Sequence, residues 1–223
     1  LLMLLIYYHM YPSSTLLGYL FCISQTSVLK SIKKIEPLVR EVLPLPKKQY
    51  DKVRRLQSVE EIEAMFPGFK AFLDATEQEI PRPHSKRKRK THYSGKRKKH
   101  TVKTQLTVNK EGLIIHKTRH VKGSMHDYAL YKRSHPQLPS NVQVGLDLGY
   151  VGIKDDYPKL NCVLPIKKKN PGRGKIGVKA QGLSEEQKAF NKALASERVV
   201  VEHTNSRIKK FRIFGDEFRS RLT

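Results

Sequence analysis

The order of strand-like and helix-like segments after residue 69 constrains the fold of this chain most. Residues 100–109 alternate between apolar and polar positions, which predicts a half-buried strand. Ser184 and Gln187 form a capping-box pattern, which predicts the start of a helix running to about Phe214. The other expected segments are strands over 69–76, 113–121, 142–148 and 160–166, and a helix over 127–133. The order β-β-β-α-β-β-α predicts an α/β domain whose mixed sheet begins as an antiparallel meander, followed by a helical crossover.

A small all-helical domain is expected over residues 1–45. Its helices are predicted over 1–10, 14–21 and 25–35, with Pro37 ending the third. Ser24 is a plausible N-cap for that third helix. This layout is typical of a helix-turn-helix, in which the N-terminal end of the second helix of the motif enters the major groove. The candidate DNA contacts are therefore Gln25, Thr26 and Lys30, although a packing or dimerisation module remains an alternative.

The segment between these two regions is expected to be a linker, and the apolar start is not expected to span a membrane. Residues 46–68 follow Pro44, and Ser58 with Glu61 predicts one short helix there. The apolar run at residues 1–8 is interrupted by Pro12, too early for a membrane span. The two cysteines form no metal-binding pair, which is typical of a reducing compartment. We therefore expect no membrane partner.

The charge of the chain predicts a polyanionic partner. Lys and Arg number 44 against 20 Asp and Glu, giving a formal net charge of +24. Nine of the seventeen residues from His84 to His100 are Lys or Arg. Placed inside a predicted hairpin, this segment is expected to bind DNA phosphates, while a localisation signal or a solvated loop remains an alternative. The candidate contacts are Lys86, Arg87, Lys88, Arg89, Lys90, Lys96, Arg97, Lys98 and Lys99.

Three acids indicate the chemistry within this basic frame. Asp74 and Asp147 each end a predicted strand, and Glu202 lies on the predicted C-terminal helix. An acid at the end of an apolar strand is costly to bury unless it is paired or binds a cation. Mg²⁺ prefers carboxylate oxygens, and two such ions can activate a water and stabilise a leaving oxygen. We expect these acids to converge on a site for about two Mg²⁺ or Mn²⁺ ions.

Neighbouring residues are assigned other roles. Asp127 is interpreted as a capping residue, and Asp155 and Asp156 as acids of a polar loop. On the C-terminal helix, Glu202 shares a face with Arg198 and Lys209. The opposite face, expected to pack on the domain, carries Val200, Thr204, Ile208 and Phe211. The pattern G-x-G-x-x-G at residues 172–177 opens no helix directly, so we interpret it as a DNA-contacting loop.

Three separated motifs contain the acids: Phe72-Leu-Asp74-Ala-Thr76, Leu146-Asp147-Leu-Gly-Tyr-Val-Gly152 and Arg198-x3-Glu202-x6-Lys209. Together they resemble the motifs of DDE transposases of bacterial insertion sequences, in the group related to Harbinger elements. The segments 93–96, 100–103 and 11–21 are also similar to that family. Ala195 stands where the family often has Tyr. Together the motifs cover most of the chain.

The resemblance implies a fold, a reaction and a set of partners. It implies a ribonuclease-H-like sheet in residues 69–223, with Asp74, Asp147 and Glu202 as the catalytic and metal-binding triad. It also implies that Arg198 and Lys209 contact DNA or steady the site. In such enzymes water first cleaves double-stranded DNA at the terminal repeats of the element, and the freed 3′-hydroxyl then attacks target DNA. Because two DNA ends must meet, a homodimer is expected, in the bacterial cytoplasm and associated with the nucleoid.

Two other functions remain open. The family pattern continues beyond Thr223, so we expect the catalytic domain to be truncated at its C-terminus. A catalytically inactive, transposase-derived DNA-binding protein is therefore the alternative to an active transposase. A basic RNA-binding protein of ribosomal type would also explain the charge, but it would not explain the three acids.

Overall fold

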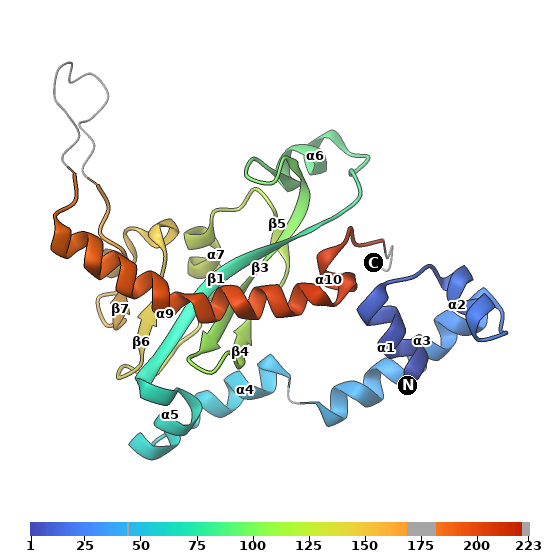
Figure 1. Ribbon diagram of the computed structural model, residues 1–223, viewed down its shortest axis with the longest axis horizontal. Helices are drawn as coiled ribbons and strands as arrows, with labels where there is room; N and C mark the ends of the chain where they lie inside the picture. Colours follow the sequence, from blue (N-terminus) through green and yellow to red (C-terminus); the bar gives the residue numbers. More distant parts are fainter. Residues whose placement is uncertain (44, 169–181, 220–223) are drawn as a thin grey trace.

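In the computed structural model, a twisted mixed sheet lies between one long helix and a layer of shorter helices (Figure 1). The structure describes residues 1–43, 45–168 and 182–219. The G-x-G-x-x-G pattern at residues 172–177 lies outside these ranges. Among the described residues, no helix combines the length and the apolar composition that crossing a membrane requires.

Three helices form the N-terminal unit: α1 (Leu2–Met10), α2 (Ser14–Leu20) and α3 (Gln25–Val42). They share a core of Met3, Leu4, Leu17, Val28 and Ile32. Ser24 caps α3 as predicted, because its side chain accepts a hydrogen bond from the Ser27 N–H. The expectation that Pro37 ends this helix was wrong, since α3 continues through it to Val42. An interior proline removes one helix hydrogen bond and crowds the carbonyl four residues before it. The packing of Ile35 and Val39, on either side of Pro37, against the core of the unit offsets this cost.

The sheet is built around two long antiparallel strands, β1 (Lys70–Glu79) and β3 (Lys99–Asn109). On its other edge, β3 pairs in turn with β2 (Tyr93–Ser94), β5 (Val121–Lys122) and β4 (Ile114–Lys117). The free edge of β1 pairs in parallel with β6 (Gln143–Gly145), and β6 pairs in parallel with β7 (Cys162–Val163). The predicted antiparallel meander is therefore confirmed, as is the mixed sheet, because β6 pairs in parallel with β1.

Three expected strands are shorter or broken. The strand predicted over 113–121 divides into β4 and β5 because the Thr118 hydroxyl accepts the Gln105 N–H, a role a backbone carbonyl would otherwise fill. The strand predicted over 142–148 ends at Gly145. The Asp147 side chain accepts the Gly149 N–H and starts the 3₁₀ turn Leu148–Tyr150. The strand predicted over 160–166 is reduced to Cys162–Val163.

Helices cover both faces of the sheet. The long helix α9 (Glu185–Lys210) crosses one face, where Val201 packs with Phe72, Leu106 and Val108. It breaks at Phe211 and is followed by the short α10 (Arg212–Gly215), so the single helix predicted to Phe214 is divided. The opposite face is covered by α4 (Pro46–Val53), α5 (Val59–Met65) and α7 (Asp127–Ser134). The remaining short elements are α6 (Lys86–His92), α8 (Ile153–Asp156) and the 3₁₀ turn Pro67–Phe69.

The polar face of β3 is buried rather than solvated. Alternation in the sequence places Val102, Thr104, Leu106 and Val108 on one face, yet the opposite face is buried as well. Its buried members are Thr101, Lys103, Gln105, Thr107 and Asn109. Most of these side chains have partners: Gln105 donates to the Tyr150 hydroxyl, and Asn109 donates to the Met65 carbonyl. A buried polar face is tolerated where its groups find partners.

Candidate active site

Asp74 lies on the β1 face that α9 covers, next to the open edge of the sheet. The strand β6 pairs with β1 only as far as Phe72, so no strand of the described residues pairs with the edge of β1 beside Asp74. Asn205 of α9 donates a hydrogen bond from Nδ2 to Asp74 Oδ2 at 2.8 Å. Burial raises the pKa of the Asp74 carboxyl, and Asp147 and Asp127 raise it further. The Ala75 N–H and the Arg198 guanidinium lower the pKa of Asp74, but burial outweighs them.

Asp147 is held in the loop that follows β6. Its Oδ1 accepts the Gly149 N–H at 2.8 Å. A Cβ on Gly149 would lie 2.8 Å from that oxygen and 3.7 Å from Asp127 Oδ2. Glycine is therefore needed at position 149 for the loop to bring the two acids this close. Asp74, Asp127 and Asp147 are thus close enough for their charges to interact.

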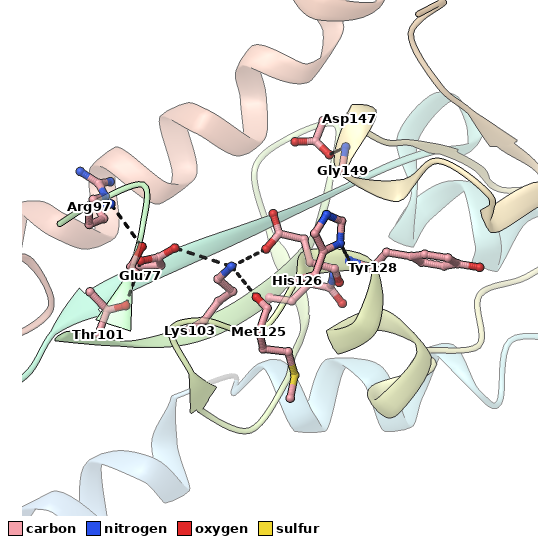
Figure 2. Close-up of polar contacts among 12 residues, drawn as sticks. Glu77, Arg97, Thr101, Lys103, Met125, His126, Tyr128, Asp147 and Gly149 are labelled. Carbon is pink, nitrogen blue, oxygen red and sulfur yellow. Dashed lines mark hydrogen bonds and ion pairs between the residues drawn. The ribbon is translucent and has the colours of Figure 1, made fainter. Parts of the chain in front are cut away.

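A network of charged residues holds Asp127 in place (Figure 2). Lys103 Nζ, on buried β3, donates to Asp127 Oδ1 and to the Met125 carbonyl, both at 2.7 Å. The same ammonium lies 3.6 Å from Glu77 Oε1, and Glu77 accepts the Thr101 hydroxyl at 2.9 Å. The interpretation of Asp127 as a capping residue was wrong: His126 is the N-cap of α7. Asp127 instead lies in the first helical turn, where Lys103 pairs with its carboxylate.

The predicted packing face of α9 is confirmed for Thr204, which is buried, and for Val200 and Ile208, which pack against the sheet. Phe211 is exposed instead, and the centre of the contact is Val201, which was not among the predicted residues and is fully buried. Residues 198 and 205 lie three and four positions either side of Val201, so their side chains flank this contact line. Glu202 is exposed, about 100° around the helix from Val201. The face of Arg198 is therefore beside the packing face rather than opposite it.

The donor atoms near Asp74 suit a hard cation, although the described residues contain no closed metal cluster. Among residues 1–43, 45–168 and 182–219, no three His, Cys, Asp or Glu side chains are grouped closely enough to hold a metal ion. The structure brings Asp74 near Asp147 and leaves Glu202 exposed. Asn205 Oδ1 is buried beside Asp74 without a hydrogen-bond partner among the described residues. A buried, unpaired amide oxygen next to two carboxylates fits a divalent ion or its bound water.

Several of the predicted DNA contacts lie close to these acids. Burial lowers the pKa of the Lys209 ammonium, and the Arg97 guanidinium lowers it further. Glu77 and Asp74 raise the pKa of Lys209, so this lysine lies between these acids and the 95–98 turn. Arg198 Nε is buried without a partner among the described residues. Lys209 and Arg97 therefore provide positive charge near Asp74 for an approaching phosphate.

The other candidate contacts lie on separate surfaces. Lys86, Arg87, Lys88 and Lys90 are exposed on α6, and Arg89 of the same helix is half-buried. Thr26 and Lys30 are exposed on α3. Gln25 is also exposed, but its Nε2 donates to Ser14 Oγ at 2.8 Å and so ties α3 to α2.

Comparison with known proteins agrees with this architecture. Residues 73–223 match the family of DDE superfamily endonucleases, and residues 1–45 match the family described as the helix-turn-helix of DDE superfamily endonuclease. The chain is 33% identical over 222 residues to a probable transposase for insertion sequence element IS702 from Microchaete diplosiphon. That alignment covers 99% of this chain and 72% of the relative. No solved structure matches the chain.

These matches establish the family. The mixed sheet, the acids near its open edge and the N-terminal helix-turn-helix match define a nuclease-type protein that works on DNA. The chain belongs to the DDE superfamily of transposase endonucleases. The resemblance drawn from the motifs around Asp74, Asp147 and Glu202 is thereby confirmed. Endonucleases of this superfamily use divalent metal ions.

Proposed function

We propose that this protein is a transposase that cuts and joins DNA strands at the ends of an insertion sequence. Asp74, Asp147 and Glu202 are its metal-binding and catalytic residues in this proposal. The observation that carries it is the placement of Asp74 beside Asp147 at an open sheet edge, within the segment that matches DDE endonucleases. About two Mg²⁺ or Mn²⁺ ions, held by these carboxylates, would activate the attacking oxygen and stabilise the leaving one.

The strand order supports a ribonuclease-H-like catalytic domain over residues 69–223. The sheet runs β4 or β5, then β3, β1, β6 and β7, with the first three antiparallel and the last two parallel to β1. In this proposal residues 1–45 form the DNA-recognition domain and residues 46–68 the linker. A homodimer follows from the need to hold two DNA ends, and the partner is double-stranded DNA of the terminal repeats and the target.

Each side chain near Asp74 has a distinct role in this proposal. Asn205 fixes Asp74 Oδ2 by hydrogen bonding, so the carboxylate keeps one orientation. Lys209 and Arg97 lie close to the acids and offer positive charge to the DNA backbone. Arg198 lowers the pKa of Asp74 and keeps an unpaired Nε for a phosphate oxygen. Glu202 is the acid of α9 that has to approach Asp74 and Asp147 when DNA and metal bind.

A strand-cleavage assay tests this proposal. Duplex DNA carrying the ends of the element is incubated with the protein and Mg²⁺, and nicked products are resolved on a denaturing gel. Asp74→Asn, Asp147→Asn and Glu202→Gln should each abolish nicking while leaving DNA binding intact. Asp155→Asn is the matched control, because Asp155 is an exposed acid on α8 outside the site. Equal nicking by Asp74→Asn and the parent protein would contradict the assignment of the catalytic triad.

One observation favours the second candidate, an inactive DNA-binding protein derived from a transposase. The described residues form no group of three metal-binding side chains, and Glu202 is exposed. An inactive protein would bind element-end DNA with a dependence on salt but produce no nick at any Mg²⁺ or Mn²⁺ concentration. The same assay therefore separates the two candidates.

A further inference from the structure

Figure 1 shows α6 at one end of the paired strands β1 and β3. A basic hollow lies beside α6, lined by residues of that helix and of the neighbouring strands. Its volume is about 710 Å³, and its lining residues are Arg82, Lys86, Arg89, Lys90, Tyr93 and His100. Tyr93 of β2 pairs directly with His100 of β3. Their ring centroids are 5.6 Å apart with an interplanar angle of 71°, so the two rings meet edge to face. The hollow thus combines four cations with two aromatic rings.

The positive charge of this hollow is not neutralised by the described part of the protein. Its lining contains no acid, and none of its four cations forms an ion pair with a described carboxylate. The nearby Glu79 pairs with Lys99 instead. Arg89 donates from Nη2 to the His84 carbonyl at 3.4 Å, while its Nε is buried without a described acceptor. Arg89 lines the hollow together with three other cations and no acid, which favours a phosphate as the counter-charge.

The aromatic rings favour more than a phosphate. Tyr93 is 43% exposed, which leaves part of the residue free for contact. Proteins that hold single-stranded nucleic acid combine a positively charged groove with aromatic side chains on which bases stack. A base inside an intact duplex is already stacked on its neighbours, so only an unpaired base is free to stack on Tyr93.

We infer that this hollow binds an unpaired nucleotide of the DNA substrate, with its phosphate at Arg89 and its base against Tyr93. The inference rests on the proposed function, because the ligand is the DNA on which the transposase acts. Ile80, whose N–H donates to the His100 carbonyl, marks the position of the hollow along β1. It is six residues from Asp74, or about 20 Å along the strand.

A tryptophan reporter tests the base contact directly. The chain contains no Trp, so Tyr93→Trp introduces a single fluorophore at the hollow. The probes are a blunt duplex of about 20 base pairs and the same duplex with about four unpaired thymidines at one 3′ end. Stacking should quench the tryptophan with the overhang duplex and not with the blunt one. Phe190→Trp on α9 is the matched control, since Phe190 is also 43% exposed, and it should not distinguish the two duplexes.

Affinity measurements with the same probes decide the outcome. Tyr93→Ala should weaken binding of the overhang duplex at least about fivefold, while Tyr93→Phe keeps the affinity of the parent protein. Binding of the blunt duplex should be the same in all three proteins. Equal affinity of the parent protein for both duplexes, or an equal loss for both in Tyr93→Ala, would overturn this inference and leave the proposed function standing. Failure of the parent protein to bind either duplex would overturn the proposed function as well.

Discussion

The folded protein disfavours the charged form of the Asp74 carboxyl. Burial raises the pKa of this carboxyl above its ordinary value, and two neighbouring acids add to the effect. The folded state therefore binds the proton more tightly than the unfolded state. Stability falls as the pH rises from the pKa of the unfolded state to the raised pKa of the folded state, and it levels off above that.

The first prediction concerns the stability that is lost by burying the charge of Asp74. In buffer with a chelator, Asp74→Asn should raise the thermal unfolding midpoint at neutral pH, because it removes a buried charge. The gain should disappear at about pH 3, where Asp74 is protonated in both the folded and the unfolded state of the parent protein. Asp155→Asn, which changes an exposed acid, should leave the midpoint unchanged at both pH values. A lower midpoint for Asp74→Asn at neutral pH would show that the charge is compensated in the folded state.

The second prediction concerns the buried ion pair of Lys103 and Glu77. Their side chains are 11% and 10% exposed, so removing one leaves the other charged and poorly solvated. Lys103→Met should lower the free energy of unfolding by about 3–5 kcal/mol, measured by urea denaturation. The double variant Lys103→Met with Glu77→Gln should recover part of that loss. Lys188→Met, which breaks an exposed pair on α9, serves as the control and should change little.

At the scale of single elements, the turn between α2 and α3 depends on one glycine. A Cβ at Gly18 would lie 2.7 Å from the Ile23 carbonyl oxygen, a backbone atom that cannot move independently of the turn. This close approach sets how α2 and α3 pack, and so how the N-terminal end of α3 is presented to DNA.

The third prediction follows from this close approach. Gly18→Ala should lower the stability of the N-terminal unit by about 1–3 kcal/mol and weaken binding of duplex DNA. Hydrogen exchange of the amides of α2 and α3 would report the stability, and fluorescence anisotropy the binding. Gly95→Ala is the control, because no atom lies within 4 Å of a Cβ placed there. Unchanged hydrogen exchange of these amides in Gly18→Ala would contradict the prediction and mean that the turn between α2 and α3 can accommodate the added Cβ.

The elements also show what the sequence could predict. The long strands and the start of α9 followed from alternation and from the capping box at Ser184, both local signals. The break between β4 and β5 depends on the Thr118 hydroxyl bonding to Gln105, thirteen residues away. Burial of Lys103 depends on Glu77 and Asp127, which are distant in the sequence. For the site, Asp74 and Asp147 could be predicted from their motifs, whereas Asn205 carried no signal of its own.

At the scale of the whole molecule, the excess of positive charge has a consequence for binding. The formal net charge of +24 is concentrated partly in the α6 segment and in the 95–98 turn. Each phosphate that a Lys or Arg neutralises releases counterions, so affinity for DNA falls as salt rises.

The fourth prediction uses that dependence. The double variant Lys96→Ala with Arg97→Ala should reduce the slope of log affinity against log salt by about 2, or about 1 per cation removed. Lys132→Ala should leave the slope unchanged, because Lys132 pairs with Asp156 on the α7 side of the molecule. The slopes are measured by anisotropy with a duplex at several salt concentrations. An unchanged slope in the double variant would place the 95–98 turn outside the DNA interface.

The C-terminal end of the described chain joins the two regions of the molecule. Arg219 donates from its backbone N–H to the Tyr11 hydroxyl at 2.8 Å, and its guanidinium lies 4.2 Å from the centroid of the Tyr11 ring. The Phe218 N–H donates to the Glu79 carbonyl at 2.8 Å, so the same segment also holds β1. The N-terminal unit is thus connected to the sheet through the segment that follows α10 as well as through the linker.

The central claim is that Asp74, Asp147 and Glu202 act together on divalent ions when DNA is bound. The measurement is Mn²⁺ binding followed by electron paramagnetic resonance, with duplex DNA present, for the parent protein and for Glu202→Gln. The account predicts that Mn²⁺ binds the parent protein and that Glu202→Gln loses at least about tenfold in affinity, with Asp155→Asn unchanged. Equal Mn²⁺ affinity in Glu202→Gln and the parent protein would contradict it.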